Sequence, residues 1–335
     1  MTLSPTIDRA AIAPTGFDAE PGSVGERLAG LGVSRRGFLR FCTTLASSLA
    51  LEAGMGPQLA HALTTARPSI VYMSFQECTG CLESLVNSYG VTIETLILQA
   101  FSIDYLETLQ AAAGARAEAA REAAMAANAG KYVLVVDGSI PKNANSGFFV
   151  SAGESAVERL KHAADRAAFV VAVGTCAAYG GLAHARPNPT GAVAVSDILP
   201  NKTVINVPGC PPIAEVVTGV LAYWLAKKTL PALDSLKRPT LYYGHTVHSE
   251  CYREETFEDG PRTKSFGDAR ARAGHCLFDL GCKGPVTHNA CSTLRWNQGT
   301  SFPIQSGHGC IGCAEPDFWD MGGLYARLPP GSFDD

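Results

Sequence analysis

Apolar and polar positions alternate in blocks along residues 68–228. Short, continuous apolar runs occur at 69–75, 132–136, 168–174 and 203–207, with a less regular run at 96–103. Segments that suit helices lie between and after them, at 81–89, 106–129, 154–166 and 213–227. Continuous apolar strands separated by helices are typical of a parallel sheet covered on both faces. The pattern therefore predicts an α/β fold, a flavodoxin-like, doubly wound parallel sheet.

The pattern changes near residue 235. The stretch 230–239 holds two prolines and mixed charge, and residues 248–313 are polar, Gly-rich and without helical or strand period. Such a segment cannot fold on a hydrophobic core of its own, so disulfides, zinc or iron–sulfur clusters must hold it. We therefore expect a flavodoxin-like domain at 63–235 and a cysteine-rich, mostly irregular domain at 236–335.

Residues 1–62 have the features of a targeting segment. The run S-R-R-G-F-L-R at 34–40 matches the twin-arginine export pattern S-R-R-x-F-L-K. A weakly apolar run at 41–51 and an A-x-A cleavage signal at 60–62 follow. The alternative is an amphipathic surface helix with a chance arginine pair. We interpret 1–62 as a twin-arginine signal peptide, which predicts a periplasmic protein exported already folded, often with a cofactor inside.

Composition narrows the function further. The net charge is −4 at pH 7, so no basic field indicates a nucleic-acid partner. No apolar run is long enough to span a membrane, which favours a soluble or peripheral mature protein. Eleven cysteines is a high number for 335 residues, and their positions indicate the chemistry.

Four cysteines follow the carboxyl ends of predicted strands. Cys78 and Cys81 come after the run 69–75, Cys176 after 168–174, and Cys210 after 203–207. In an open parallel sheet these ends meet at one edge, where ligands bind. Four converging thiolates match the demand of one cubane iron–sulfur cluster. Cys81 also opens a predicted helix, whose N-terminal dipole favours a thiolate.

Other cofactors fit this edge less well. A flavin site would need Ser, Thr and Gly donors in the loop that Cys78 and Cys81 occupy. A nicotinamide site would need G-x-G-x-x-G after the first strand, and that motif is missing. Two disulfides are the remaining alternative, although a C-x-x-C pair is more common in redox or metal sites.

Seven further candidate ligands lie in the second domain: His248, Cys251, Cys276, Cys282, Cys291, Cys310 and Cys313. Their spacing fits neither a zinc ribbon nor the ferredoxin run C-x2-C-x2-C. They divide as four, His248 to Cys282, plus three, Cys291 to Cys313. His248 belongs with them through its H-x-x-C spacing. The other histidines, at 245, 275, 288 and 308, are interpreted as surface or core residues.

Five motifs together resemble the small subunit of a nickel–iron uptake hydrogenase. They are E-C-T-G-C at 77–81, G-T-C-A-A-Y-G-G at 174–181, V-P-G-C-P-P at 207–212, H-S-E-C at 248–251 and N-A-C-S-T-L-R-W-N-Q-G-T-S-F-P-I-Q-S-G-H-G-C-I-G-C at 289–313. The resemblance covers nearly the whole chain after residue 62.

The resemblance implies three clusters in a row and assigns each ligand to one. The proximal set, Cys78, Cys81, Cys176 and Cys210, would hold a [4Fe-4S] cluster. The distal set, His248, Cys251, Cys276 and Cys282, would hold a second. The medial set, Cys291, Cys310 and Cys313, would hold a [3Fe-4S] cluster, with Pro303 in place of a fourth thiolate.

The resemblance also implies partners. The nickel–iron centre would belong to a large subunit, so this chain would hold no catalytic residue and would pass electrons from hydrogen to an acceptor. A cytochrome b or another membrane redox subunit is the expected acceptor. Glu77 is a candidate for a hydrogen bond across the subunit interface or for a proton relay, the alternative being a solvated loop carboxylate.

Three departures from the family's pattern stand out. Many exported relatives end in a membrane anchor, and this sequence shows none, so another subunit anchors it, it is soluble, or it is truncated. Asp137 stands where the family commonly has Glu, which leaves its contact with the proximal set open. Gly80 and Gly181 stand where oxygen-tolerant relatives carry two extra cysteines.

Two rival functions remain at this stage. A hydrogen-sensing regulatory complex uses similar subunits, but a sensor that acts on cytoplasmic kinases needs no export signal. A non-enzymatic, disulfide-stapled secreted protein would use ten cysteines in bridges. Bound iron and sulfide would separate the hydrogenase interpretation from the second rival.

Overall fold

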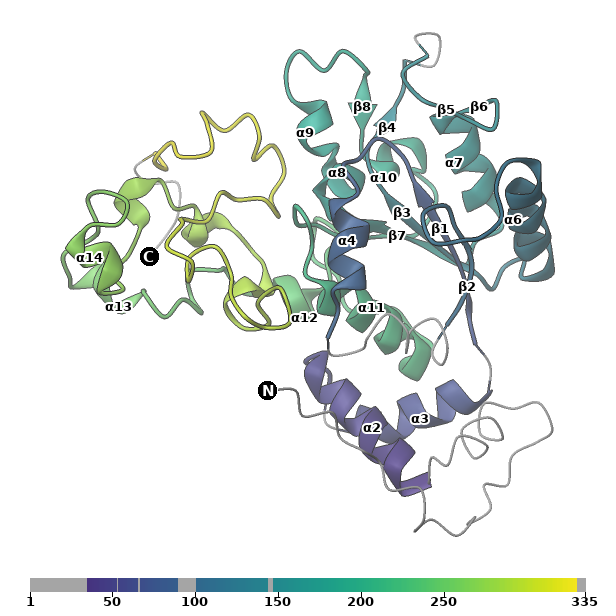
Figure 1. Cartoon of the computed structure of the whole chain (residues 1–335), viewed down its shortest axis with the longest axis horizontal. Coiled ribbons are helices and arrows are strands. Elements are labelled where there is room, and N and C mark those ends of the chain that lie inside the picture. The colour runs from purple at the N-terminus through teal and green to yellow at the C-terminus, as the bar shows by residue number, and fades with distance from the viewer. Residues whose placement is uncertain (1–34, 53, 66, 90–100, 144–146, 330–335) are drawn as a thin grey trace.

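The computed structural model of the chain describes residues 35–52, 54–65, 67–89, 101–143 and 147–329. Five parallel strands form the central sheet in the order β2-β1-β3-β7-β9. They are β1 (Ser69–Ser74), β2 (Ser102–Leu106), β3 (Val133–Asp137), β7 (Phe169–Val173) and β9 (Val204–Val207). Figure 1 shows this sheet and its helices on one side and an irregular lobe, which follows α12, on the other.

Alternate strand residues enter two separate cores. Tyr72, Val135 and Val171 pack with α4 (Gly80–Val86) and α11 (Ala214–Lys227) on one face. Met73 and Leu134 pack with α6 (Ala115–Ala127) and α7 (Ala156–Asp165) on the other. Because neighbouring residues of a strand point to opposite faces, continuous apolar runs are needed when both faces are covered. The doubly wound α/β prediction is confirmed.

The edge strand and its helix differ from the sequence prediction. The run 96–103 overlaps β2 only at Ser102 and Ile103, and its first part lies outside the described residues. Residue 106, the predicted start of a long helix, instead ends β2, and α6 begins at Ala115 after Gly114 at φ 57°. The prediction of a helix at 106–129 is therefore wrong over its first nine residues. Leu106 pairs with Tyr72 of β1 instead, and residues 107–114 form turns before α6.

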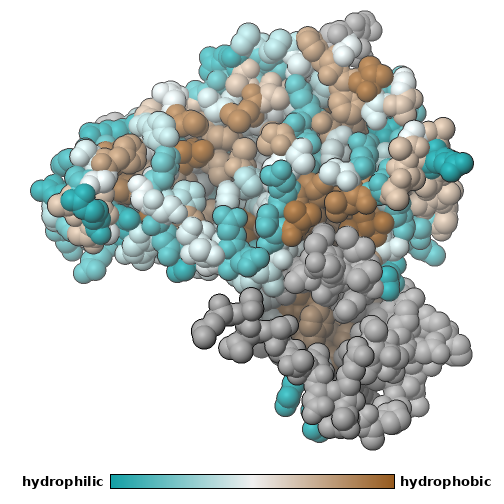
Figure 2. All heavy atoms as spheres, viewed as in Figure 1, coloured by the Kyte–Doolittle hydropathy of each residue, from teal (hydrophilic) through white to brown (hydrophobic). Residues whose placement is uncertain are grey.

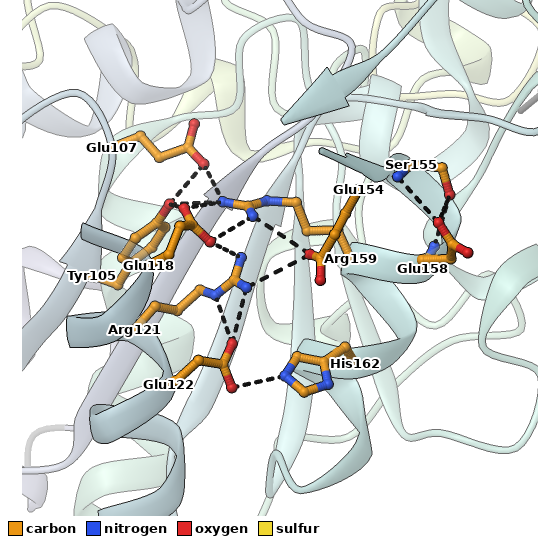
Figure 3. Close-up of polar contacts among 10 residues, drawn as sticks. All are labelled: Tyr105, Glu107, Glu118, Arg121, Glu122, Glu154, Ser155, Glu158, Arg159 and His162. Atoms are coloured by element: carbon orange, nitrogen blue, oxygen red, sulfur yellow. Dashed lines mark hydrogen bonds and ion pairs between the residues drawn. The ribbon is translucent and has the colours of Figure 1, made fainter. Parts of the chain in front are cut away.

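Two buried arginines join the end of β2 to α6 and α7 (Figure 3). Arg159 donates to Glu118 at 2.8 Å and to the Tyr105 hydroxyl at 2.8 Å, and Arg121 pairs with Glu118 at 3.0 Å. Ser155 caps α7 and forms a capping box with Glu158. These contacts fix the edge of the sheet that the hydrophobic pattern left ambiguous.

Residues in the interpreted signal segment also form helices. The first is α2 (Arg35–Ser48) and the second is α3 (Met55–Thr65). Phe38, Cys42 and Leu49 are buried in the same core as α11, and the Tyr242 hydroxyl donates to the Leu49 carbonyl at 2.7 Å. The described part of the segment thus packs on the domain, a contact that the interpretation as a targeting segment outside the fold did not anticipate. Its role in export stays a prediction.

The cysteine-rich lobe is mostly irregular, as predicted. Between residues 240 and 329 the described elements are short: α12 (Thr240–Tyr243), α13 (Glu255–Glu258), α14 (Ala269–Arg272) and the 3₁₀ turns η3 (Phe278–Leu280), η4 (Gly284–Val286) and η5 (Ala290–Ser292). Figure 2 shows polar and apolar residues interspersed over its visible face, on the left. No helix within the described ranges is long and apolar enough to cross a membrane.

Candidate metal centres

The proximal set lies at the carboxyl ends of three neighbouring strands. Cys78 follows β1, and Cys81 lies in the first turn of α4. Cys176 is in α8 (Gly174–Tyr179), directly after β7, and Cys210 follows β9. Burial strongly raises the pKa of Cys81, and the charges of Asp137, Cys176, Cys210 and Cys78 raise it further. The structure therefore brings these four thiols together, as the strand-end argument predicted.

Glycines leave room for these thiols. Gly174 has φ +85°, and a Cβ there would collide with the Cys81 sulfur. Gly181 has φ +60°, and a Cβ there would come within 2.5 Å of the Cys176 sulfur. A residue with a side chain would be strained at both positions and would occupy the space beside the sulfurs. The backbone around the proximal set is thus shaped to keep its sulfurs accessible to a group they surround.

Two carboxyls flank the proximal set. The Tyr72 hydroxyl donates to Asp137 at 2.9 Å, and burial raises the pKa of Asp137 to about 6. Burial also raises the pKa of Glu77 to about 7, and the Asp137 charge raises it further. Asp137 therefore does reach the surroundings of Cys81, despite being shorter than glutamate. A carboxyl with a pKa near neutrality suits a relay, so the role predicted for Glu77 stays open.

The distal set is built from loops between 248 and 282. His248 packs edge-on against Phe257 with ring centroids 4.5 Å apart, and Arg262 lies over the Phe257 ring at 4.4 Å. A Cβ on Gly284 would lie 3.5 Å from the Cys282 sulfur and 3.6 Å from the Cβ of His248. Gly284 therefore lies against both of these ligand candidates.

Cys251, Cys276 and Cys282 are near enough to act on one another. Burial raises the pKa of Cys276 to about 11, and the charges of Cys282 and Cys251 raise it further. The structure therefore groups the three thiols of the distal set and places His248 beside Cys282.

In the medial set, Cys291 is buried, and Cys310 and Cys313 are half-buried. Burial raises the pKa of Cys291 well above its ordinary value, and the charges of Cys313 and Cys310 raise it further. The Cys310 sulfur lies 3.5 Å from the Thr287 hydroxyl. Pro303 is exposed, whereas its neighbours Phe302 and Ile304 are buried in the core that contains Cys291.

Backbone N–H groups connect the three sets. The N–H of Cys310 donates to the Cys282 sulfur at 3.2 Å, which links medial to distal. Burial raises the pKa of Cys313 to about 11, and a hydrogen bond from the Cys210 backbone lowers it, which links medial to proximal. The Thr175 hydroxyl also donates to the Cys313 carbonyl. The sets therefore lie in the order proximal, medial, distal.

The donor chemistry fits iron–sulfur clusters. Burial raises the pKa of nearly all these thiols, for example that of Cys176 to about 12, so a metal is needed to hold them as thiolates. All eleven cysteines are described and none forms a disulfide. No three His, Cys, Asp or Glu side chains within the described ranges converge on a single-ion site. In an iron–sulfur cluster, cysteine thiolates bind different irons.

Family models match both halves of the chain. Residues 243–326 match the model described as the C-terminal part of the NiFe/NiFeSe hydrogenase small subunit. Residues 78–224 match the model of the 20 Kd subunit of NADH ubiquinone oxidoreductase. The first match covers the distal and medial sets, and the second begins at Cys78 and includes the proximal set.

Relatives that match most of the chain are also hydrogenase small subunits. The uptake hydrogenase small subunit of Azotobacter vinelandii is 46% identical over 298 residues, which are 89% of this chain and 83% of that protein. The hydrogenase-1 small chain of Escherichia coli K12 is 45% identical over 298 residues, covering 89% and 80%. The chain belongs to the nickel–iron hydrogenase small subunits. The resemblance stated from the motifs is confirmed.

Solved structures share the small subunit's fold. A chain of the [NiFeSe] hydrogenase of Desulfovibrio vulgaris Hildenborough superimposes with a TM-score of 0.72 at 34% identity, covering 79% of this small subunit and 99% of that chain. A chain of the Dm. baculatum [NiFeSe] hydrogenase gives a TM-score of 0.73 at 30% identity, covering 79% and 100%. The similarity spans both the sheet and the cysteine-rich lobe, because neither alone would reach such coverage.

Motif spacing missed two residues of the small subunit's site. Thr175 bridges the loop after β9 to the medial set, since its hydroxyl also accepts from the Gly209 N–H at 2.9 Å. Lys283 is 1% exposed and follows Cys282 directly. Neither carries a spacing signal, because both act through long-range contacts that a sequence does not display.

Proposed function

We propose that this small subunit conducts electrons from a nickel–iron large subunit, through three iron–sulfur clusters, to a redox acceptor. The proximal set would hold a [4Fe-4S] cluster, the medial set a [3Fe-4S] cluster and the distal set a [4Fe-4S] cluster with one imidazole ligand. When bound, the clusters supply one-electron carriers. The nickel–iron centre belongs to the partner, which makes the assembly at least a heterodimer.

The observation that carries this proposal is the pair of hydrogen bonds between sets. The hydroxyl of Thr175, the residue before Cys176, donates to the Cys313 carbonyl, and the N–H of Cys310 donates to the Cys282 sulfur. The first bond joins a loop of the proximal set to a medial ligand, and the second joins a medial ligand to a distal one. A protein that only stored iron or stapled its loops would have no need of such contacts in line.

Residues of this chain set the local charge at the two ends of the row of three sets. At the proximal end, Glu77 and Asp137 lie in a half-buried and a buried position, where each can hold a proton close to neutral pH. At the distal end, His248 replaces a thiolate with a neutral ligand, which changes the charge of the site. We infer that electrons leave on the distal side, toward a cytochrome b or another membrane redox subunit.

Export by the twin-arginine route to the periplasm completes the proposal. It is supported by the motif at 34–40 and the A-x-A signal at 60–62. Arg35 lies in α2 and Arg36 is exposed there, whereas Ser34 lies outside the described residues. A regulatory, hydrogen-sensing complex would not require this segment.

The test is anaerobic purification of the native complex. The large subunit should co-purify, with about 11 irons in this small subunit, four plus four plus three. Electron paramagnetic resonance should show a three-iron signal in the oxidised protein and four-iron signals after reduction. Ten cysteines in disulfides and no iron or sulfide would overturn the proposal, as would a chain that purifies alone with full hydrogen oxidation.

A further inference from the structure

Lys283 is a buried cation between two ligand sets. Its side chain is 1% exposed, and its own N–H donates to the Cys310 carbonyl at 2.7 Å. It directly follows Cys282 of the distal set, and Cys310 belongs to the medial set. The residue therefore connects the two sets through its backbone as well as through its position.

The side chain of Lys283 is held in its charged form by geometry. Its Nζ donates to the carbonyls of Gly323, Leu324 and Ala326 at 3.2, 2.9 and 3.2 Å. A lysine ammonium has three N–H donors, and a neutral amine has only two. Three accepting carbonyls therefore match the ammonium, and they leave none of its donors unpaired.

Within the described ranges, the charges that act on Lys283 are those of two cysteines. Burial lowers the pKa of Lys283, whereas the thiolates of Cys310 and Cys282 raise it, Cys310 more strongly. The ammonium and the sulfurs therefore interact through a low-dielectric interior, where charges are weakly screened.

We propose that the Lys283 ammonium is a fixed positive charge that raises the reduction potentials of the medial and distal iron–sulfur centres. Reduction adds an electron, and a nearby positive charge stabilises the more negative state. The effect presupposes the proposed function, since it acts on centres held by these sets. It should be larger on the medial side, because the Lys283 N–H donates to the Cys310 carbonyl and the Lys283 side chain lies against Gly312, where a Cβ would be 3.4 Å from the lysine Cδ.

The test is a redox titration of the loaded complex followed by electron paramagnetic resonance. Lys283→Met removes the charge and keeps the length of the side chain. We expect the medial reduction equilibrium to shift on the order of tenfold, which is about 59 mV lower for a one-electron couple. The distal centre should shift in the same direction by less. The proximal centre is the internal control and should not move.

Two controls separate charge from packing. Lys283→Arg keeps the charge, so its potentials should match the wild type, and a shift equal to that of Lys283→Met would overturn the proposal. Lys264→Met removes a cation of the same lobe that is 64% exposed and paired with Asp279. Solvent screens that charge, so the potentials should stay unchanged.

A second test of the proposal keeps Lys283 and changes the charge beside it. Leu324 is 38% exposed, and its carbonyl accepts from the ammonium. Leu324→Glu adds a counter-charge nearby and should lower the medial potential by part of the Lys283→Met effect, whereas Leu324→Gln should not. Unchanged potentials in both Lys283→Met and Leu324→Glu would refute the proposal; if Lys283→Met loses its clusters, Leu324→Glu alone decides. Absence of any cluster signal in the wild type would instead refute the proposed function.

Discussion

Thr175 should be the most sensitive position outside the ligands themselves. Its side chain is 1% exposed, accepts from the Gly209 N–H at 2.9 Å and donates to the Cys313 carbonyl. Thr175→Val keeps the shape and removes both hydrogen bonds. The loops of the proximal and medial sets would then lose their polar connection.

The size of the effect follows from the groups left behind. Each buried partner left unpaired costs about 1–3 kcal/mol, and the Cys313 carbonyl is only partly buried, so we expect about 3 kcal/mol in total. Thr175→Ser keeps the hydroxyl and loses one methyl, which costs about 1 kcal/mol. At about 2–4 °C for each kcal/mol in a chain of this size, the midpoints should fall by roughly 6–12 °C and 2–4 °C.

The assay is iron release from the anaerobic complex on heating, followed by the loss of cluster absorbance. Both variants should be loaded and reduced identically before heating. Equal midpoints for Thr175→Val and Thr175→Ser would show that packing, not the hydrogen bonds, sets the stability here. The reasoning about the bridge between sets would then be wrong.

Three further predictions concern export, the medial set and oxygen. Replacing Arg35 and Arg36 by Lys should leave the small subunit and its partner in the cytoplasm. Normal periplasmic hydrogenase activity in that mutant would contradict the export proposal. Pro303→Cys should convert the medial centre to a four-iron form with a lower reduction potential, because a fourth thiolate retains the missing iron. A three-iron paramagnetic resonance signal that persists in iron-replete protein would count against the placement of Pro303. The wild type should lose hydrogen-oxidation current on an electrode when oxygen is injected and recover after reduction, because Gly80 and Gly181 add no thiolates to the proximal set; sustained current under oxygen would show that protection needs no extra cysteines.

The sequence was sufficient for β1, β3, β7 and β9 but not for the edge strand β2. β3 and β7 are buried along their whole length, so their apolar runs are unbroken. β2 has the sequence SIDYL with its first three residues half-buried, and Ser69 and Ser102 donate to Asp104. In β2 these polar residues interrupt the apolar run, whereas β9 at the other edge is buried along its length and keeps its pattern.

The site was predictable to the extent that chemistry depends on residue type. The convergence of Cys78, Cys81, Cys176 and Cys210 could be predicted because the carboxyl ends of parallel strands meet at one edge of the sheet, whereas the assignment of cysteines to the distal and medial sets came from the family resemblance. The contact between α2 and α11 was not predictable, because local periodicity does not reveal what a helix packs against. The role of Lys283 was not predictable for the same reason, because the carbonyls that accept from its ammonium lie forty or more residues later in the sequence.

The order of the three sets along the sequence differs from their order in space. The medial set is hydrogen-bonded to the distal set and to the proximal loop that holds Thr175, yet its residues, 291–313, are made after the distal residues 248–282. A polypeptide is synthesised at about 5–20 residues per second. The proximal and distal residues are therefore made before the medial residues that lie between them in space. Sulfur and iron cannot be installed progressively from one end to the other during synthesis. The centre of the line is completed last, when Cys310 reaches the Cys282 sulfur, so the order of synthesis differs from the order in space.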